Sequence, residues 1–281
     1  MKGIIVAAGY GTRFLPATKT VPKELLPVGS RPSIAWIVDE FVASGIVDIA
    51  IISSRRKKAL EDYFDREVEL EELFRREGKP EKLALIAPAD ARIVFVRQRE
   101  MRGTGHALLQ ARSFVGDSPC VVAYPDDLHS GPVPLARQLA ELHAATGKSV
   151  LATILEPGDV SRYGVVDPAQ DGVSVRGFVE KPAPGREPSH EVSIGRYLYT
   201  PEFFEILEEG WRRHQVGEYF HTYALDRLIA AGKVVYKRVE GERLDTGDPA
   251  GYLDAVLRDA AADPALRPVL EKFARERLGL S

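Results

Sequence analysis

The chain has 281 residues, of which 44% are hydrophobic and 28% are charged, and its formal net charge is −3. This length can bury a large core, and the nearly balanced charge gives no reason to expect nucleic-acid binding. The single cysteine, Cys120, excludes an internal disulfide framework and fits a reducing compartment. Because neither a secretory signal nor a run of about 18 apolar residues is present, we expect a cytoplasmic protein with no membrane partner.

Strand-like and helix-like segments alternate through the first half of the chain. Apolar, β-branched runs predict buried strands, and the stretches between them carry the apolar periodicity of helices. This alternation predicts an α/β, Rossmann-like fold with a mixed, mostly parallel central sheet flanked by helices. The predicted strands span residues 2–8, 46–53, 92–96 and 118–124, and the predicted helices span residues 33–44 and 104–112.

Residues 55–78 are highly charged, with apolar residues at roughly helical spacing. This pattern predicts a solvated helical hairpin that lies over the sheet.

The pattern changes beyond about residue 130. A helix over residues 132–146 precedes several strands without long helices between them, which predicts a smaller, partly antiparallel extension that closes over the first half. Two C-terminal helices follow, and an apolar stripe on the last one indicates docking on the body of the chain. The later strands are predicted over 148–155, 163–167, 173–180, 192–199 and 234–239, with mostly helix over 201–232.

The first predicted strand opens into a glycine-rich loop that carries cations. Glycines allow the backbone to approach a ligand closely, with N–H groups facing an anion. Neither the P-loop nor the dinucleotide-binding motif is present, because Thr12 and Arg13 follow Gly11 and Phe14 replaces the third glycine. The loop predicts a polyphosphate site, and an ordinary turn with surface cations is the alternative. The loop residues concerned are Gly9, Gly11, Thr12, Arg13, Lys19 and Lys23.

Two acidic clusters follow predicted strands. Asp126 and Asp127 come directly after one strand, and Asp245 and Asp248 lie in a glycine turn near the last strand. Carboxylates at the carboxyl end of a sheet suit Mg²⁺ that shares its ligands with substrate phosphates. The alternatives are turn formation by the first pair and helix N-capping by Asp248, which precedes Pro249.

Other polar residues also stand at the ends of predicted strands. Glu180 could bind sugar hydroxyls and Lys181 could bind a sugar phosphate. The alternative is that this adjacent Glu–Lys pair is simply exposed to solvent at a strand edge, as such pairs usually are. Gln98 offers a donor and an acceptor that can pair with a pyrimidine edge. The sequence shows no recognisable Ser-His-Asp or Cys-His arrangement, so no covalent catalysis is predicted.

Together these motifs resemble those of the bacterial UTP–glucose-1-phosphate uridylyltransferases (UDP-glucose pyrophosphorylases), in the sugar-phosphate nucleotidyltransferase superfamily. The matching stretches run in the family's order and cover nearly the whole chain. They are AAGYGTRFLPATKTVPKELLP at 7–27, VRQ at 96–98, GTGHA at 103–107, PDD at 125–127, YGVVD at 163–167, VEKP at 179–182, GRY at 195–197 and LDTGDPAGYL at 244–253.

The resemblance implies Mg²⁺-dependent transfer of a uridylyl group from UTP to α-D-glucose 1-phosphate, giving UDP-glucose and pyrophosphate. The alternatives are a thymidylyltransferase, another sugar-1-phosphate uridylyltransferase and a regulatory homologue with little turnover. One domain is implied, with a nucleotide-binding half at about 1–130, a sugar-binding half at about 131–248 and C-terminal helices at about 249–281. UTP and a sugar 1-phosphate are the expected partners, in a homo-oligomeric enzyme that is a dimer or tetramer.

The resemblance also implies individual roles. Arg13, Lys23 and Lys181 would be catalytic, and Asp126 and Asp245 would bind Mg²⁺. The expected nucleotide-binding residues are Ala8, Gly9, Gly11, Thr12, Arg13, Gln98 and Gly103, with Lys23 beside Arg13 on the triphosphate, and the expected sugar-phosphate-binding residues are Gly164, Glu180 and Lys181.

Two segments depart from the family's pattern. Residues 188–190 read Pro-Ser-His where the family usually has P-S-N, and residues 218–224 read EYFHTYA where it usually has E-I-Q-L-T-D-A. Both segments lie in the sugar-binding half, so we expect them to affect the choice of sugar rather than the choice of nucleotide.

Overall fold

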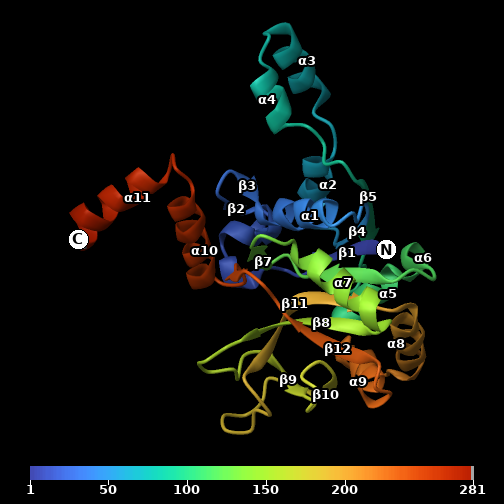
Figure 1. The fold of residues 1–281 in the computed structure, drawn as a ribbon. Helices are drawn as coiled ribbons and strands as arrows, with labels where there is room; N and C mark the ends of the chain where they lie inside the picture. Colours follow the sequence, from blue (N-terminus) through green and yellow to red (C-terminus); the bar gives the residue numbers. More distant parts are fainter. Residues whose placement is uncertain (280–281) are drawn as a thin grey trace.

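The structure is a computed structural model and describes residues 1–279. Within these residues a nine-stranded mixed sheet forms the centre, with helices on both faces (Figure 1). This confirms the predicted α/β fold. The strands of this sheet are β1 (Lys2–Val6), β4 (Asp48–Ser53), β5 (Arg92–Arg97), β6 (Cys120–Ala123), β8 (Ser149–Leu155), β9 (Gly164–Pro168), β10 (Val175–Glu180), β11 (Glu191–Tyr199) and β12 (Val234–Arg238).

The first half of the chain builds the parallel part of the sheet, in the order β6-β1-β4-β5. β1 is an almost continuous apolar run because both of its faces are covered. Ile5 belongs to the core on one face, and its neighbour Ile4 belongs to the core on the other. Because the carboxyl ends of these parallel strands meet at one edge, the loops that follow them lie together.

Helices cover each face of the sheet. α1 and α7 pack on one face, and α5, α8 and α9 pack on the other. None of the helices within residues 1–279 combines the length and the apolar character that a bilayer crossing requires. The helices are α1 (Ser33–Ala43), α2 (Lys58–Phe64), α3 (Val68–Arg76), α4 (Pro80–Leu85), α5 (Thr104–Gln110), α6 (Arg112–Val115), α7 (Leu135–Thr146), α8 (Pro201–Arg213), α9 (Thr222–Ala230), α10 (Pro249–Ala262) and α11 (Arg267–Phe273), with short helical turns η1 (Thr12–Phe14), η2 (Ala17–Lys19), η3 (Lys23–Leu25) and η4 (Ala274–Leu278).

The antiparallel extension continues the central sheet. β11 is antiparallel to β6, β8 and β9, and β10 pairs with β9 at the edge. The expectation that this extension closes over the first half is therefore wrong. β11 joins both halves because its first part pairs with β9 and its last part pairs with β6. Both parts also pair with β8, with a register shift between Ser193 and Tyr197.

A small two-stranded sheet was not predicted from the sequence. It consists of β7 (Asp127–Ser130) and β13 (Glu242–Asp245), which pair antiparallel so that Asp127 lies opposite Asp245. A second two-stranded sheet is the hairpin of β2 (Pro27–Val28) and β3 (Arg31–Pro32). The first of these pairs matters for function because it brings the two acidic clusters together.

The charged stretch is helical, as predicted, but most of it does not lie over the sheet. α2 buries Leu60 in the core, whereas α3 and α4 project from the body (Figure 1). Val68 of α3 is 50% exposed, and Leu85 of α4 is 83% exposed. The one buried side chain of α3 is that of Glu71, which forms ion pairs with Arg66 and Arg75.

The last helix also differs from expectation. α10 is anchored by Ala255 in the core and by the hydroxyl of Tyr252, which donates to the carbonyl oxygen of Pro27 at 2.6 Å. Beyond the break at Asp263, α11 points away from the body (Figure 1). Phe273, on its apolar stripe, is 53% exposed. The prediction that this stripe docks on its own chain is wrong.

Candidate active site

A pocket of about 300 Å³ opens at the carboxyl edge of the parallel strands. It brings together loops that follow β1, β5 and β6, together with a segment that precedes α9. The lining includes six residues that were expected from the sequence to bind a nucleotide or a metal. The structure brings these six residues together, and their individual roles stay predictions. These six are Ala8, Gly9, Lys23, Gln98, Gly103 and Asp126.

The glycine loop is held in shape by its own side chains. Gly11 has a φ of 66°, and a Cβ atom there would lie 3.3 Å from the Cβ of Lys23. The hydroxyl of Thr18 donates to the carbonyl oxygen of Gly11 at 2.7 Å. Glycine is therefore required by both backbone conformation and space, and Thr12 and Arg13 follow in a tight helical turn.

Gln98 forms the back of the pocket. Its side chain is buried, and Nε2 donates to the carbonyl oxygen of Gly103 at 3.2 Å. The amide nitrogen is thus used within the protein, whereas Oε1 accepts no hydrogen bond from another group within residues 1–279. Gly103 has a φ of 93°, and a Cβ atom there would lie 2.5 Å from the carbonyl oxygen of Tyr219.

Residues 218–221 pack against the loop around Gly103, next to the pocket. The N–H of Tyr219 donates to the carbonyl oxygen of Arg102 at 2.7 Å, and its carbonyl accepts from the N–H of Gly105 at 2.8 Å. Glu218 and Phe220 line the same pocket as Gln98. This segment therefore lies at the same pocket as Gln98, and its expected effect on the choice of sugar stays a prediction.

The other departure lies elsewhere. His190 is on an exposed loop, where its Nδ1 contacts the carbonyl oxygen of Glu156 at 2.8 Å. The hydroxyl of Ser189 donates to the carbonyl oxygen of Val166. These contacts hold the loop before β11, and neither residue lines the pocket.

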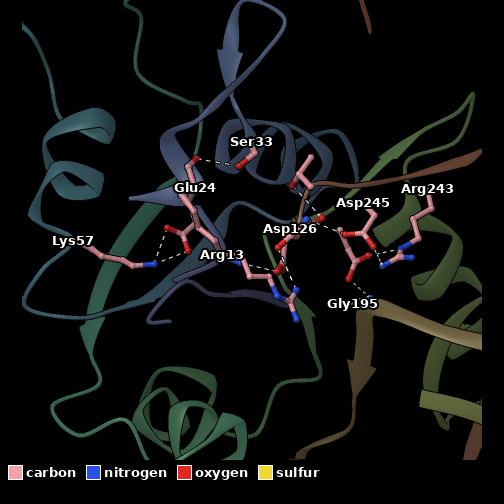
Figure 2. A network of polar contacts seen from close by, with 12 residues as sticks. Arg13, Glu24, Ser33, Lys57, Asp126, Gly195, Arg243 and Asp245 are labelled. Atoms are coloured by element: carbon pink, nitrogen blue, oxygen red, sulfur yellow. Dashed lines mark hydrogen bonds and ion pairs between the residues drawn. The ribbon is translucent and has the colours of Figure 1, made fainter. Parts of the chain in front are cut away.

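The two acidic clusters converge beside the glycine loop (Figure 2). A Cβ atom on Gly247 would lie 3.0 Å from Oδ1 of Asp245, 3.5 Å from Oδ2 of Asp126 and 3.6 Å from Nη1 of Arg13. The N–H of Thr246 donates to the carbonyl oxygen of Asp126 at 2.7 Å, and Arg13 donates to the carbonyl oxygen of Gly247 at 3.2 Å. Asp248 accepts from the N–H groups of two residues at the start of α10, so its predicted role as an N-cap is confirmed.

Opposite charges neutralise this cluster. Nζ of Lys23 lies 2.6 Å from Oδ2 of Asp126. Burial favours the neutral form of both groups, but their mutual attraction outweighs it, so the pKa of Lys23 is raised and that of Asp126 is lowered. Burial raises the pKa of Asp127 despite its ion pair with Arg243. Of the two neighbouring aspartates, Asp126 lines the pocket and Asp127 does not.

Both carboxylate oxygens of Asp127 are bonded to other groups of the protein. Its Oδ2 accepts from the N–H of Gly195 at 3.0 Å, and its other oxygen pairs with Arg243. Arg243 also lies 3.1 Å from Oδ2 of Asp245. Because Arg243 touches both carboxylates, it sets the position of Asp245 relative to β7.

The donor set fits a divalent metal ion. Asp126 and Asp245 approach the same point from β6 and β13, which supplies the one or two protein carboxylates that Mg²⁺ takes when phosphates and water complete its shell. Within residues 1–279 no group of three or more His, Cys, Asp or Glu side chains forms an all-protein metal site. The carboxylate pair is thus suited to a metal that arrives with a phosphate ligand.

The residues expected to hold the sugar phosphate form a separate cluster on the β9–β10 hairpin. Gly164 pairs with Glu180, and a Cβ atom on Gly164 would lie 3.0 Å from Oε2 of Glu180. Lys181 has a φ of 50°, which is uncommon for a residue with a side chain, and its N–H donates to the carbonyl oxygen of Tyr163 at 2.9 Å. The structure brings these three together but does not include them in the pocket lining.

Two buried ion pairs that support the site were not predicted. Nζ of Lys57 lies 2.6 and 2.7 Å from the two carboxylate oxygens of Glu24, next to Lys23 in the chain (Figure 2). Arg196 is fully buried, pairs with Glu40 of α1 and donates to the carbonyl oxygen of Asp127 at 3.1 Å. One residue of each pair belongs to a motif that the sequence analysis quoted, since Glu24 is part of PKELLP and Arg196 is part of GRY. These charged residues inside largely apolar motifs were the available sign of buried ion pairs.

Comparisons with known proteins agree with this arrangement. A family model described as nucleotidyl transferase matches residues 2–262. UTP–glucose-1-phosphate uridylyltransferase 2 of Staphylococcus saprophyticus is 39% identical over 284 aligned residues, which cover 98% of this chain and 97% of that protein.

Solved structures give the same result. UDP-glucose pyrophosphorylase from Acinetobacter baumannii superimposes with a TM-score of 0.88 at 32% identity and covers 98% of both chains. A UTP-bound structure of the enzyme from Acinetobacter baumannii has a TM-score of 0.87 at 31% identity, covering 98% of this chain and 99% of that one. The chain therefore belongs to the nucleotidyl transferase family and, within it, to the UTP–glucose-1-phosphate uridylyltransferases.

Proposed function

We propose that this enzyme transfers a uridylyl group from UTP to α-D-glucose 1-phosphate, releasing pyrophosphate and forming UDP-glucose, with Mg²⁺ as its metal ion. The observation that carries the proposal is the convergence of Arg13, Asp126 and Asp245 around Gly247, beside a pocket that contains Gln98. A nucleotide base, a polyphosphate and a metal ion can thus be held at one edge of the sheet. The names of the relatives support UTP and glucose 1-phosphate as the substrates.

The base would occupy the pocket between the glycine loop and residues 218–221. Uracil has an N3–H donor flanked by two carbonyl acceptors, and the Oε1 atom of Gln98 can accept from that donor. The backbone of Ala8, Gly9 and Gly103 lies at the same pocket, where it can approach the ring and ribose closely. Gly11 and Thr12 would present backbone N–H groups to the phosphates.

The cations would organise the phosphates. The sugar phosphate oxygen attacks the α-phosphorus, and the pyrophosphate departs in line on the opposite side, so positioning and charge neutralisation supply most of the catalysis. Two unit negative charges about 4 Å apart repel by about 4 kcal/mol at an effective dielectric of 20. Arg13 and Lys23 offset this repulsion on the nucleotide side. When bound at Asp126 and Asp245, Mg²⁺ would add positive charge against the phosphate oxygens.

The β9–β10 hairpin would deliver the sugar phosphate. Lys181 has a side chain that is 66% exposed, so its ammonium can contact an incoming phosphate without breaking a buried pair. Glu180 lies beside Gly164 and can accept hydrogen bonds from sugar hydroxyls. The unusual φ of Lys181 supports a functional role, because such conformations persist mainly where the surrounding structure requires them.

We further propose the division into a nucleotide-binding half at about 1–130, a sugar-binding half at about 131–248 and C-terminal helices from about 249. A homo-oligomeric state, a dimer or tetramer, and a cytoplasmic location belong to the same proposal.

Specificity constants test the choice of substrates. We expect UTP to be used better than dTTP, and glucose 1-phosphate better than galactose 1-phosphate or N-acetylglucosamine 1-phosphate. A preference for dTTP would move the chain to the thymidylyltransferases. A preference for another sugar would contradict the glucose assignment while the uridylyl transfer itself stands.

A further inference from the structure

Two exposed apolar surfaces lie outside the active site. The first is the C-terminal arm, defined here as residues 264–279, which consists of α11 and the turn after it. Its stripe is open to solvent, because Leu266, Val269 and Phe273 are 41%, 66% and 53% exposed. An arm that packs so little on its own chain is too short to be a stable isolated helix in water.

The second surface is a groove of about 550 Å³ between α1 and the segment that runs from α2 to α4. Its apolar lining includes Val38, Phe64, Leu85 and Pro88. Leu85 is 83% exposed, which is the second-largest exposure among the large hydrophobic side chains of residues 1–279. The groove thus presents apolar surface to solvent.

The charges of the two surfaces are complementary. The arm has four basic and two acidic side chains within residues 264–279, and none of the four forms an ion pair with a carboxylate among residues 1–279. The groove is lined by four carboxylates and one arginine, and that arginine pairs with Asp39. Its other three carboxylates have no ion pair within the same described residues. The arm's cations are Arg267, Lys272, Arg275 and Arg277, and the groove's unpaired carboxylates are Asp62, Asp65 and Glu67.

The arm of the same chain does not face this groove. α10 is fixed by the hydrogen bond from Tyr252 to Pro27, and α11 leaves it in a direction away from α1 and α4 (Figure 1). A second copy can supply the arm instead. Reciprocal exchange of two arms is a closed, two-fold arrangement, which satisfies both copies and leaves no surface open for further growth.

We propose that the C-terminal arm of one copy docks in the groove of a second copy, and that the second copy's arm docks in the groove of the first. This inference rests on the proposed homo-oligomeric state and assigns its interface. Val269 and Phe273 enter the apolar part of the groove, while the basic side chains of the arm lie along its acidic rim. The proposed chemistry of the active site does not depend on it.

Two charge insertions test the arrangement by sedimentation velocity. The arm variant is Val269→Asp/Phe273→Asp, and the groove variant is Leu85→Asp. These side chains are all more than half exposed, so folding is not at risk. We expect each variant alone to be monomeric, with a dissociation constant raised at least about 100-fold, as expected when several apolar contacts of about 1 kcal/mol or more are lost. Val216→Asp, at a side chain 85% exposed elsewhere, serves as the control and should assemble like the unaltered chain.

Mixing the two variants gives the decisive result. A mixed dimer regains one intact arm–groove contact, so the equimolar mixture should contain dimers that neither variant forms alone. A groove variant that assembles normally while the arm variant does not would show that the arms pair elsewhere, and would overturn the proposal. A monomeric unaltered chain would overturn both this inference and the homo-oligomeric state, while pyrophosphate release from UTP independently reports the enzyme function.

Discussion

The ammonium of Lys23 lies 2.6 Å from a carboxylate oxygen of Asp126, although 103 residues separate the two in the chain. Lys23 is the cation proposed for the triphosphate, and Asp126 is the carboxylate proposed for the metal. In this structure each neutralises the other. Binding of a metal ion and a polyphosphate would give each of them a new partner of opposite charge, so the site exchanges one set of ion pairs for another.

Loss of the charge on Asp126 should abolish catalysis and spare the fold. We expect Asp126→Asn to lower kcat by about 100-fold or more, because a carboxylate that holds a catalytic metal supports several kcal/mol of charge stabilisation. Thermal unfolding should change much less than activity. Asp117→Asn, at an exposed position, is the matched control. Near-normal turnover of the Asp126 variant would mean that this residue only forms a turn.

Removal of the metal ion should have the same effect on the unaltered enzyme. A chelator is expected to abolish pyrophosphate release, and added Mg²⁺ should restore it. Turnover that continues in excess chelator would contradict the metal assignment to Asp126 and Asp245.

Replacement of Gln98 should weaken UTP binding. Gln98→Leu leaves the pyrimidine edge unpaired in a buried site, which costs about 1–3 kcal/mol and corresponds to a rise of about 5- to 150-fold in Kd. Isothermal titration with UTP measures this directly, and Gln170→Leu at an exposed position is the control. If UTP affinity is unchanged, the base binds elsewhere.

Phe220 should act on the nucleotide rather than the sugar. We expect Phe220→Gln, which restores the residue usual in the family, to change the KM for UTP by about 5- to 30-fold, through loss of apolar contact of about 1–2 kcal/mol. The KM for glucose 1-phosphate should change much less. Val216→Gln, in the same loop but outside the pocket lining, is the control. A larger effect on the sugar substrate would contradict this placement.

The ion pair between Lys57 and Glu24 should contribute to stability. Lys57→Met leaves the carboxylate of Glu24 buried without its partner, which is expected to lower the free energy of unfolding by about 3–5 kcal/mol. The double variant Glu24→Leu/Lys57→Met should recover much of this loss. Lys58→Met, at the exposed neighbouring position, should change little in urea denaturation. If Lys57→Met and Lys58→Met changed the free energy of unfolding equally, the buried ion pair would not contribute to stability.

His221 should make stability sensitive to acid. Burial lowers the pKa of His221 from 6.5 to about 4, so the unfolded chain binds the proton more tightly than the folded one. Stability from this group is therefore complete above pH 6.5 and falls by up to about 3 kcal/mol as the pH drops toward 4. Urea unfolding at pH 7 and pH 4 should show a smaller acid loss for His221→Leu than for the unaltered chain, whereas the exposed His190→Leu should show the same loss. Identical pH dependence in all three would contradict the lowered pKa.

Local patterns predicted the parallel half of the fold well. The apolar run at Ile4 and Ile5, the glycine turn at Gly11 and the cap at Asp248 each depend on neighbouring residues, so a single stretch of sequence is enough to recognise them. The glycine loop, Gln98 and Asp126 were singled out because they follow predicted parallel strands, at whose carboxyl edge ligands bind. Ala8 and Gly103 were expected only from the resemblance to the family.

Other features depend on contacts between distant segments and were missed. The pairing of Asp127 with Asp245 and that of Glu24 with Lys57 arise only when separate loops meet. Phe220 lies in the half of the chain that we propose to bind the sugar, but it lines the pocket beside Gln98, because the backbone of Tyr219 bonds to the loop around Gly103. The stripe on α11 was correctly recognised as apolar, but an apolar stripe does not reveal whether the covering surface belongs to the same chain.

The central claim is that Arg13, Lys23, Asp126 and Asp245 assemble a site for uridylyl transfer, and its most direct test is pyrophosphate release by the purified chain. With UTP, glucose 1-phosphate and Mg²⁺ present, we predict stoichiometric formation of pyrophosphate and UDP-glucose, with neither product when any one component is omitted. Absence of both products under these conditions, from a folded chain that still binds UTP, would contradict the account.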